Sequence, residues 1–342
     1  MEHNPLVSIT TIVYNGEPFI ARCIEGVLNQ SYQNIEYVIV NDGSTDGTAD
    51  ICRSYANRDD RIVFIENPRN MGLTYTRNRA FDACTGKYIA VNDADDFSYP
   101  DRIWKQVEFM ETHPNVVLCG TQARMVFADG TSTPYNFPHS NEDLRIRMLE
   151  GVPMLNSSSM VKRSVLTRHG LRYLEGYASC EDFKLFAQIS LYGEAVNLPE
   201  TFVDYFVHGN QQTKLQRRGM IRDSGIIVCE LLEDLGLAFR SDSEREAMIE
   251  AFGFNFPMSP GHVRDLGQVY QRLLEYNVGW RFFHQGKLEQ FLRNKYFEVC
   301  YHSTKFSNAL DIWKMFVRTN FVRSVDILNC APKIIYSVIR TK

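Results

Sequence analysis

The first 120 residues alternate between short β-branched runs and longer amphipathic stretches, and this alternation restricts the fold more than any other feature. The apolar runs predict strands at residues 7–13, 35–40, 62–65, 87–91 and 116–119. The stretches between them have apolar residues three or four positions apart, which predicts helices at residues 17–30, 48–55, 73–84 and 101–113. This order favours an α/β fold with a mostly parallel sheet and helices on both faces.

The character of the chain changes near residue 215. Before that point we expect helices at residues 142–149 and 181–192, a strand at 156–161 and an edge strand at 201–207. After it, helical periodicity alone remains, at residues 221–235, 243–252, 263–276, 288–299 and 306–316. For a chain of 342 residues we therefore predict two domains, residues 1–214 and a helical C-terminal region of residues 215–342.

Composition narrows the class of protein. A formal net charge of -4 gives no reason to expect nucleic acid as a partner. The eight cysteines form no Cys-x-x-Cys motif, so we interpret them as small buried apolar residues in a reducing compartment. No signal peptide and no apolar run of spanning length is visible. We expect a cytoplasmic protein, or one bound peripherally to the cytoplasmic face of a membrane.

Polar residues follow three of the predicted strands. The first loop contains Tyr14, Asn15, Gly16 and Glu17, the second runs from residue 41 to 46, and the third from residue 92 to 96. Loops at the carboxyl ends of parallel strands converge on one crevice, which is where open α/β sheets bind ligands. These loops therefore predict a ligand site at one edge of the sheet.

The third loop holds three carboxylates, Asp93, Asp95 and Asp96. Such a cluster repels itself unless a cation is present, and Mg²⁺ or Mn²⁺ binds one or two carboxylates together with substrate phosphates. The alternative is a solvated acidic turn ahead of the helix that starts near Asp101. The position at the end of a strand favours the metal.

Other candidate residues have structural alternatives of equal or greater weight. Asp42 could accept a hydrogen bond from a base or ribose, or belong to a turn whose Ser44 caps the next helix. Tyr14 could stack on a base, although packing is the commoner role. Asp182 could be a general base, but with Glu181 it opens a predicted helix, where capping is the simpler explanation. A lone His208 is more often structural than a ligand.

Taken together, these segments resemble the family 2 glycosyltransferases, inverting enzymes with the GT-A fold. The resemblance covers about residues 6 to 213 and depends on the order and spacing of its parts. These parts are Val7-Ser8-Ile9 with Tyr14-Asn15, Gln30-Ser31-Tyr32 with Glu36, Val40-Asn41-Asp42-Gly43-Ser44-Thr45-Asp46, Asn70-Met71-Gly72, Thr76-Arg77-Asn78-Arg79-Ala80, Gly86-Lys87-Tyr88-Ile89-Ala90, Asp93-Ala94-Asp95-Asp96, Glu181-Asp182 and His208.

The resemblance implies a role for each matching position. Asp42 corresponds to an aspartate that contacts the base, and Thr11, Tyr14, Glu17 and Arg77 correspond to residues around the same nucleotide and its diphosphate. Asp93 corresponds to the DxD residue near the ribose and Asp95 to the one that holds Mn²⁺ or Mg²⁺. Asp182 corresponds to the catalytic base, and His208 to a histidine that helps hold the metal or the diphosphate in some members.

The resemblance also implies the reaction, which is transfer of a sugar from a nucleotide diphosphate donor, with UDP the commonest carrier, to an acceptor hydroxyl on a glycan or a lipid-linked glycan. This sequence lacks the Gln-x-x-Arg-Trp motif of processive members, which favours one transfer per encounter. It also reads Tyr-Phe-Val-His at residues 205–208 where the family often has Tyr-Arg-x-His. Two alternatives stay open, a nucleotidyltransferase and a non-catalytic nucleotide-sugar-binding scaffold.

The last 38 residues are basic and apolar. From residue 305 to 342 the chain has seven Lys or Arg residues against two Asp residues, a net charge of +5, together with several large apolar side chains. Such a segment can lie on an anionic membrane surface, which would suit a lipid-linked acceptor, or pack on the rest of the protein with its charges in water.

Overall fold

The structure is a computed structural model that describes residues 4–177, 180–209, 216–253 and 257–304. The chain divides into two compact units. The first consists of residues 1–144 and 152–216, and the second of residues 145–151 and 217–342. Each unit is considered by itself.

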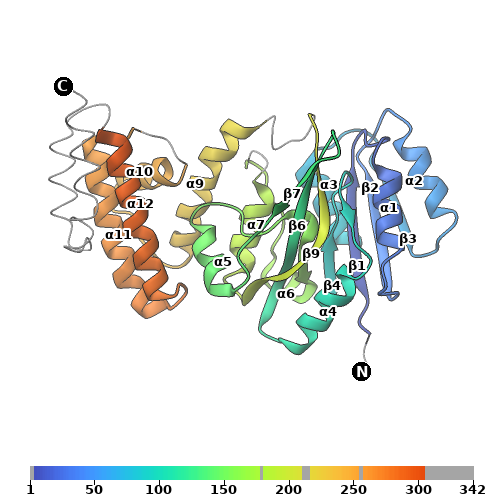
Figure 1. Ribbon diagram of the computed structural model, residues 1–342, viewed down its shortest axis with the longest axis horizontal. Coiled ribbons are helices and arrows are strands. Elements are labelled where there is room, and N and C mark those ends of the chain that lie inside the picture. Colours follow the sequence, from blue (N-terminus) through green and yellow to red (C-terminus); the bar gives the residue numbers. More distant parts are fainter. Residues whose placement is uncertain (1–3, 178–179, 210–215, 254–256, 305–342) are drawn as a thin grey trace. The chain divides into compact units, whose positions relative to one another are not determined.

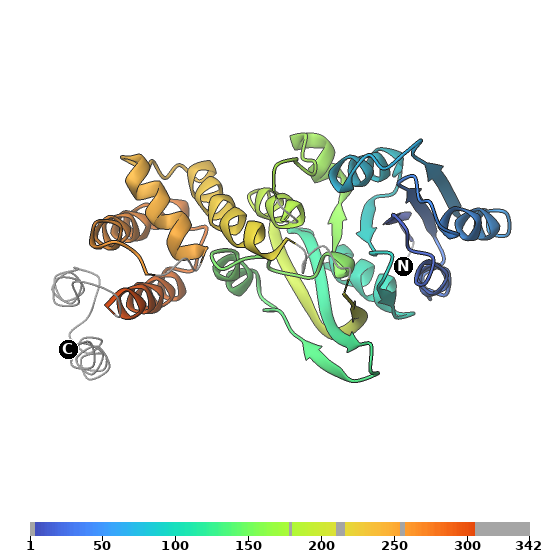
Figure 2. The ribbon, with the colours of Figure 1, turned by 90° about the horizontal axis from the view of Figure 1, so that it is seen from above.

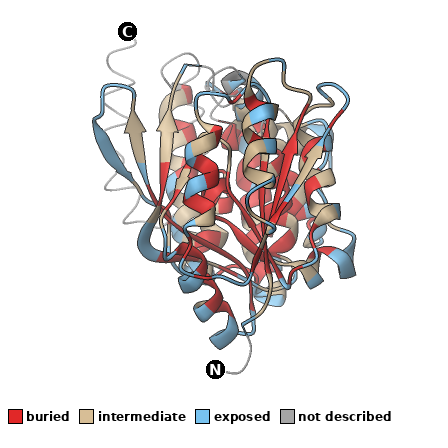
Figure 3. Cartoon of the chain, turned by 90° about the vertical axis from the view of Figure 1, so that its right-hand side faces the viewer, coloured by how far each residue is buried: buried red, intermediate tan, exposed pale blue. Residues whose placement is uncertain are grey.

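The first unit begins with the expected alternation, and the α/β prediction is confirmed. Its elements are β1 (Val7–Val13), α1 (Ile20–Leu28), β2 (Ile35–Asn41), α2 (Thr48–Ala56), β3 (Ile62–Glu66), α3 (Leu73–Ala83) and β4 (Tyr88–Val91). The strands β3, β2, β1 and β4 lie side by side in that order, and all three pairings are parallel. The strands β1 and β2 are buried almost throughout, because helices cover both faces of the sheet (Figure 3).

The register brings the carboxyl ends of these strands to one edge. Val13 of β1 lies opposite Asn41 of β2, which in turn lies opposite Glu66 of β3. The helices α1 and α2 cover one face of this part of the sheet and α3 covers the other (Figures 1 and 2). The loops that follow β1, β2, β3 and β4 therefore leave the sheet next to one another.

The second half of the sheet is mixed. It contains β5 (Phe97–Ser98), β6 (Val116–Phe127), β7 (Ser132–Tyr135), β8 (Met160–Lys162) and β9 (Glu194–Val207), with the helices α4 (Arg102–Thr112), α5 (Asn141–Met148), α6 (Arg163–His169) and α7 (Glu181–Ile189). The strand β8 joins β4 to β6 with antiparallel pairings on both sides, and β6 and β9 are parallel.

Two strand predictions need correction. Residues 156–161 form a 3₁₀ turn, Asn156–Ser158, before β8, because the hydroxyls of Ser158 and Ser159 donate to carbonyls three residues earlier and stabilise a turn instead of an extended chain. The expected edge strand at 201–207 is the end of the 14-residue β9, and β5 pairs with it at Val203 and Asp204. Among the described strands, β5 therefore stands at that edge.

The second unit is helical, as expected. Its helices are α9 (Arg217–Asp234), α10 (Asp242–Phe252), α11 (Pro260–Trp280) and α12 (Gln285–Thr304). Ser241 and Ser259 cap α10 and α11 by accepting backbone hydrogen bonds, and a buried ion pair of 2.6 Å joins Arg272 to Glu244. The helix predicted at 306–316 and the basic tail lie outside the described residues.

Two further observations concern the described part of the chain. None of its helices combines the length and the apolar character needed to cross a membrane. Its seven cysteines are all free and buried, as predicted, while Cys330 lies outside the described residues.

Candidate functional site

The loops after β1 and β2 are fastened to each other. Asn15 has a positive φ of 50°, and its side-chain oxygen accepts a 2.8 Å hydrogen bond from the backbone N–H of Thr45. The carboxylate of Glu17 accepts a 2.8 Å bond from the N–H of Gly47 at the start of α2. Tyr14, directly before Asn15, is 48% exposed. The two loops form one rim, on which the Tyr14 ring is available to a ligand.

Asp42 lies deeper, 5% exposed at the end of β2. One carboxylate oxygen accepts from the side-chain amide of Asn67 at 2.6 Å and from the N–H of Met71 at 2.8 Å, and the other accepts from the N–H of Gly72 at 3.1 Å. Asp42 thereby holds the loop between β3 and α3 in place. A carboxylate has about four acceptor positions, so one remains for a ligand. Ser44 does not cap α2, since the N-cap is Gly47.

Thr11 lies beneath the site. Its side chain is buried, and its hydroxyl donates to the carbonyl of Asn92 at 2.7 Å and accepts from the Tyr37 hydroxyl at 2.9 Å. Because both roles of the hydroxyl are occupied inside the sheet, this side chain supports the loop after β4 and does not line the rim.

The acidic loop after β4 is held from two sides. The side-chain amide of Asn156 donates to both oxygens of Asp93, at 3.0 and 3.1 Å, and the Ser157 hydroxyl lies within hydrogen-bond reach of Asp93 and Asp96. Beneath the loop, the fully buried guanidinium of Arg102 donates to the carbonyl of Val91 at 2.8 Å. The loop is therefore a rigid part of the fold, and its acidic side chains are not simply a solvated turn.

Asp95 faces His208, which lies just after β9. Its carboxylate oxygen is 2.9 Å from Nε2 of His208, and the imidazole ring stacks on Phe19 with the centroids 4.9 Å apart. Burial and the charge of Asp93 raise the pKa of Asp95, so a cation at this point would relieve an excess of negative charge.

These two side chains fit a divalent metal that is completed by substrate. No group of three or more His, Cys, Asp or Glu residues converges within the described part of the chain. Asp95 and His208 would therefore supply two ligands, and phosphate oxygens and water would supply the rest. An oxygen and an imidazole nitrogen suit Mn²⁺, and Mg²⁺ also uses one or two protein ligands beside phosphates.

Arg77 of α3 connects the acidic loop to α7. Its guanidinium donates to Glu181 at 2.6 Å, lies 3.5 Å from Asp93, and lies over the Tyr173 ring with its carbon 5.1 Å from the centroid. Burial lowers the pKa of Arg77, but the charges of Glu181 and Asp93 outweigh it and keep the side chain a cation. Glu181 is buried in the first turn of α7, where the capping explanation places it, and it is also engaged in this ion pair.

Asp182 follows in the first turn of α7. It is half-buried, and one of its oxygens accepts a 2.7 Å bond from the N–H of Phe183. Burial and the neighbouring charge of Glu181 raise its pKa to about 7, against an opposing effect of Arg77. A carboxylate with a pKa near 7 has the proton affinity that a general base needs at neutral pH.

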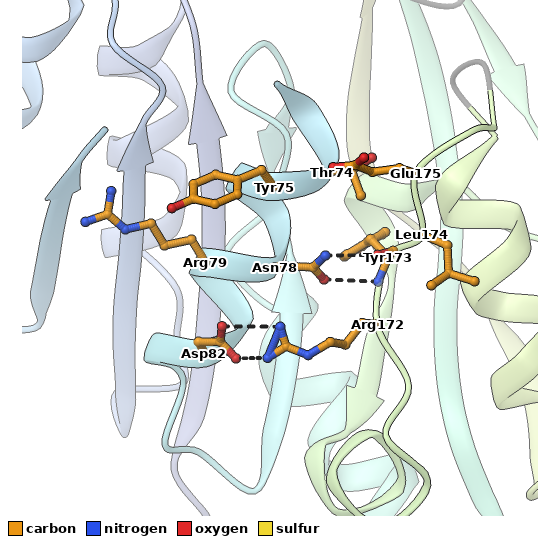
Figure 4. A pocket seen from close by; sticks show the side chains of 9 residues that line it. All are labelled: Thr74, Tyr75, Asn78, Arg79, Asp82, Arg172, Tyr173, Leu174 and Glu175. Carbon is orange, nitrogen blue, oxygen red and sulfur yellow. Dashed lines mark hydrogen bonds and ion pairs between the residues drawn. The ribbon is translucent and has the colours of Figure 1, made fainter. Parts of the chain in front are cut away.

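The segment before α7 is docked on α3 (Figure 4). The side-chain amide of Asn78 donates to the carbonyl of Tyr173 at 2.9 Å and accepts from its N–H at 3.1 Å, while Arg172 pairs with Asp82. An open pocket of about 460 Å³ lies here, lined by Thr74, Tyr75, Asn78, Arg79, Asp82, Arg172, Tyr173, Leu174 and Glu175. It contains none of the predicted site residues. Its Tyr173 wall is the ring that contacts Arg77.

The structure thus gathers most of the predicted residues into one region. Arg77 contacts Asp93 and the Glu181 that precedes Asp182, and Asp95 of the acidic loop contacts His208. Asp42 is connected to α3 through Asn67. The supporting residues Asn67, Arg102, Asn156, Ser157 and Glu181 were not assigned to the site from the sequence. Only Glu181 had a local signal, as a charged residue beside the predicted base.

The chain matches known proteins in the same region. Residues 8–168 match the family model described as glycosyl transferase family 2. An uncharacterized glycosyltransferase of Haemophilus influenzae is 31% identical over 224 residues, which cover 63% of this chain and 69% of that protein. The UDP-Glc:alpha-D-GlcNAc-diphosphoundecaprenol beta-1,3-glucosyltransferase WfaP of Escherichia coli is 30% identical over 65% of this chain and 85% of its own.

Solved structures share the fold. TarS of S. aureus (residues 1–349, in complex with UDP-GlcNAc) superposes with a TM-score of 0.59 at 16% identity, covering 88% of this chain and 91% of that one. The mannosyltransferase PcManGT of Pyrobaculum calidifontis, in complex with GDP-Man and Mn²⁺, gives a TM-score of 0.52 at 14% identity, covering 99% and 88%.

An α/β sheet whose first four strands are parallel and carry an acidic loop at their carboxyl edge agrees with the GT-A fold of these solved structures. The chain belongs to glycosyltransferase family 2. It is a glycosyltransferase, and the predictions of family and fold are confirmed.

Proposed function

We propose that this enzyme transfers a sugar from a UDP-sugar to a hydroxyl of a lipid-linked glycan, with inversion at the anomeric carbon, in the assembly of a surface polysaccharide or glycolipid. The observation that carries the proposal is the cluster in which Arg77 contacts both Asp93 of the acidic loop and Glu181 beside Asp182. One cation thus contacts a donor-side group and the residue that precedes the proposed base. The name of the relative WfaP gives UDP-Glc as its donor and alpha-D-GlcNAc-diphosphoundecaprenol as its acceptor, which supports the choice of donor and acceptor.

The reaction is a single displacement. Asp182 takes the proton of the acceptor hydroxyl while the acceptor oxygen forms a bond to the anomeric carbon, and the bond from that carbon to the diphosphate oxygen breaks. The nucleoside diphosphate leaves with the electron pair. Arg77 and the rigid acidic loop orient the donor, so that the acceptor approaches from the side opposite to the leaving group.

The donor occupies the rim formed by the loops after β1, β2 and β4. Asp42 accepts from the base with its remaining acceptor position, the Tyr14 ring stacks on it, and Asp93 contacts the ribose. Glu17 and Thr11 do not contact the donor. Glu17 holds the rim in place, and Thr11 holds the loop after β4. Asp95 and His208 would hold Mn²⁺ or Mg²⁺, and the bound ion would stabilise the charge of the diphosphate.

Binding of the donor is tested by calorimetry with UDP, GDP and dTDP in the presence of Mn²⁺ or EDTA. We expect UDP to bind with Mn²⁺ and not with EDTA, and the Asp95→Ala variant to lose this binding. Tighter binding of GDP than of UDP would show that the donor is a GDP-sugar. Binding that is unaffected by both EDTA and Asp95→Ala would refute the metal site.

Transfer is tested by release of UDP from UDP-glucose in the presence of a GlcNAc-diphospholipid acceptor. Asp182→Asn should bind UDP like the wild type and lose transfer by at least about 1,000-fold, because the proton acceptor is gone. The matched control is Asp60→Asn, an exposed aspartate between α2 and β3, which should keep full activity. Retained turnover in Asp182→Asn would assign the base to another residue.

We further propose that residues 1–214 form the catalytic domain and that the helical region 215–342 contacts the acceptor, a partner or the membrane. The charge of +5 over residues 305–342 supports binding to the anionic cytoplasmic face of a membrane. Flotation with vesicles containing anionic lipid compares the full chain with a chain ending at residue 304. Equal flotation of both would refute the role of the tail.

A further inference from the structure

The environment of Asp182 contains charges of both signs from several elements. Glu181 is its neighbour on α7, Arg77 comes from α3, Asp93 from the loop after β4, and Tyr173 from the segment before α7. Among these groups only Arg77 is a cation. The Asp182 carboxylate therefore lies beside one positive and several ionisable acidic groups, at a place where solvent screening is weak.

Arg77 and Glu181 form a close and buried pair. The N–O distance is 2.6 Å, and the side chains are 11% and 4% exposed. A buried charge that loses its partner is strongly destabilised, so the two side chains hold each other in position. Because Glu181 precedes Asp182 directly, this pair also fixes the first turn of α7, whose N-cap residue makes no side-chain capping bond.

We propose that the Arg77–Glu181 ion pair is a positioning device for Asp182, which places this carboxylate opposite the acidic loop and balances two charges of opposite sign beside it. The proposal rests on the proposed role of Asp182 as the base. It assigns Glu181 and Arg77 opposite effects on the proton affinity of that residue. Neither residue accepts the proton itself, because each is occupied by the other.

The sign of each effect follows from electrostatics. Neutralising Glu181 removes a negative charge and leaves Arg77 facing Asp182, so the carboxylate form is favoured and the pKa of Asp182 falls. Neutralising Arg77 removes the cation that, among the described residues, lowers the pKa of Asp182, so this pKa rises. If the ion pair had a purely structural role, the two substitutions would shift the pKa of Asp182 in the same direction or leave it unchanged.

The test is a titration of Asp182 itself, by ¹³C NMR of the full chain labelled at the aspartate carboxyl carbon. The Asp182 signal is the one that disappears in Asp182→Asn. We expect a midpoint near pH 7 in the wild type, a midpoint lower by about one pH unit in Glu181→Gln, and one higher by about one unit in Arg77→Gln. Glu181→Asp, which keeps the charge, should keep the wild-type midpoint.

The double variant Arg77→Gln/Glu181→Gln provides a second test. It leaves neither partner charged and alone, so it folds more readily than the single variants. Its midpoint should return to within about half a unit of the wild type, since the two effects oppose each other. Shifts of the same sign in the two single variants, no shift in either, or a double variant displaced by a full unit would overturn the proposal.

This test separates the proposal from the proposed function. If UDP release persists in Asp182→Asn, the base is another residue and the proposal falls with it. If release is lost in Asp182→Asn but the midpoints do not move apart, Asp182 remains the base and the ion pair is only structural. If the midpoints move as expected, the acid limb of the pH dependence of kcat/KM should move with them.

Discussion

Replacing Asp182 by asparagine should stabilise the protein at alkaline pH while it abolishes transfer. In the folded state the pKa of Asp182 is raised to about 7, from an ordinary value of 3.8, by burial and by Glu181. An acid whose pKa is higher in the folded state binds more protons there, so the free energy of unfolding falls as pH rises between the two values. The loss begins near pH 4 and is complete just above pH 7.

The size of the effect follows from the same two values. Their difference corresponds to about 4 kcal/mol at pH 8, which is an upper bound because the side chain keeps partial contact with water. At pH 5 the corresponding bound is about 1.5 kcal/mol. Asparagine has nearly the same shape and no charge, so Asp182→Asn should gain little at pH 5 and most of the effect at pH 8.

Thermal unfolding followed by circular dichroism at pH 5, 6, 7 and 8 measures this difference. The midpoint of Asp182→Asn should exceed that of the wild type by an amount that grows with pH, whereas Asp60→Asn should show no such trend. Because the chain has two compact units, the comparison uses midpoint differences and not a two-state free energy. A difference that is constant with pH, or a wild type that is the more stable at pH 8, would refute the reasoning.

Three other substitutions test the frame around the site. Arg102→Met should destabilise the protein by at least about 3 kcal/mol, seen as a lower unfolding midpoint, because it leaves buried acceptors such as the Val91 carbonyl without a donor. Gly43→Ala should destabilise by at least about 2 kcal/mol in the same assay, because φ is 67° and a Cβ would lie 2.3 Å from the carbonyl carbon of Arg69. Asn156→Ala should raise the KM for UDP-glucose about tenfold with a small change in the midpoint, because Asp93 loses two side-chain hydrogen bonds; an unchanged KM would contradict its role at the acidic loop.

The first half of the sheet could be predicted because its signals are local. The strands from β1 to β4 are rich in β-branched and apolar residues, and α1 shows a clear apolar face. The short strands β5 and β7, of two and four residues, carry no periodicity that could be read. The 3₁₀ turn at Asn156–Ser158 is set by serine hydroxyls, whereas the neighbouring apolar residues favour a strand.

The candidate site divides in the same way. Asp42, Asp93 and Asp95 stand directly after strands, where the fold class itself predicts a ligand. The supporting contacts have no such local signal. Asn156 lies 63 residues from Asp93 in the sequence, and Arg77 lies 104 residues from Glu181. Pairs so distant in sequence depend on the tertiary fold, and composition or spacing does not reveal them. The sequence therefore favours capping for Glu181 and does not predict its ion pair with Arg77.

The helix α3 contacts several parts of the site from one turn, including the surroundings of Asp182, the proposed base. Thr76 accepts a 2.9 Å hydrogen bond from Asn67, whose amide also donates to Asp42. Arg77 contacts Asp93 and Glu181. Asn78 binds both the carbonyl and the N–H of Tyr173. Successive residues of a helix point about 100° apart, so three consecutive side chains can reach three different neighbours. One turn of α3 therefore connects the surroundings of Asp42 with the acidic loop and with Glu181, the neighbour of the proposed base.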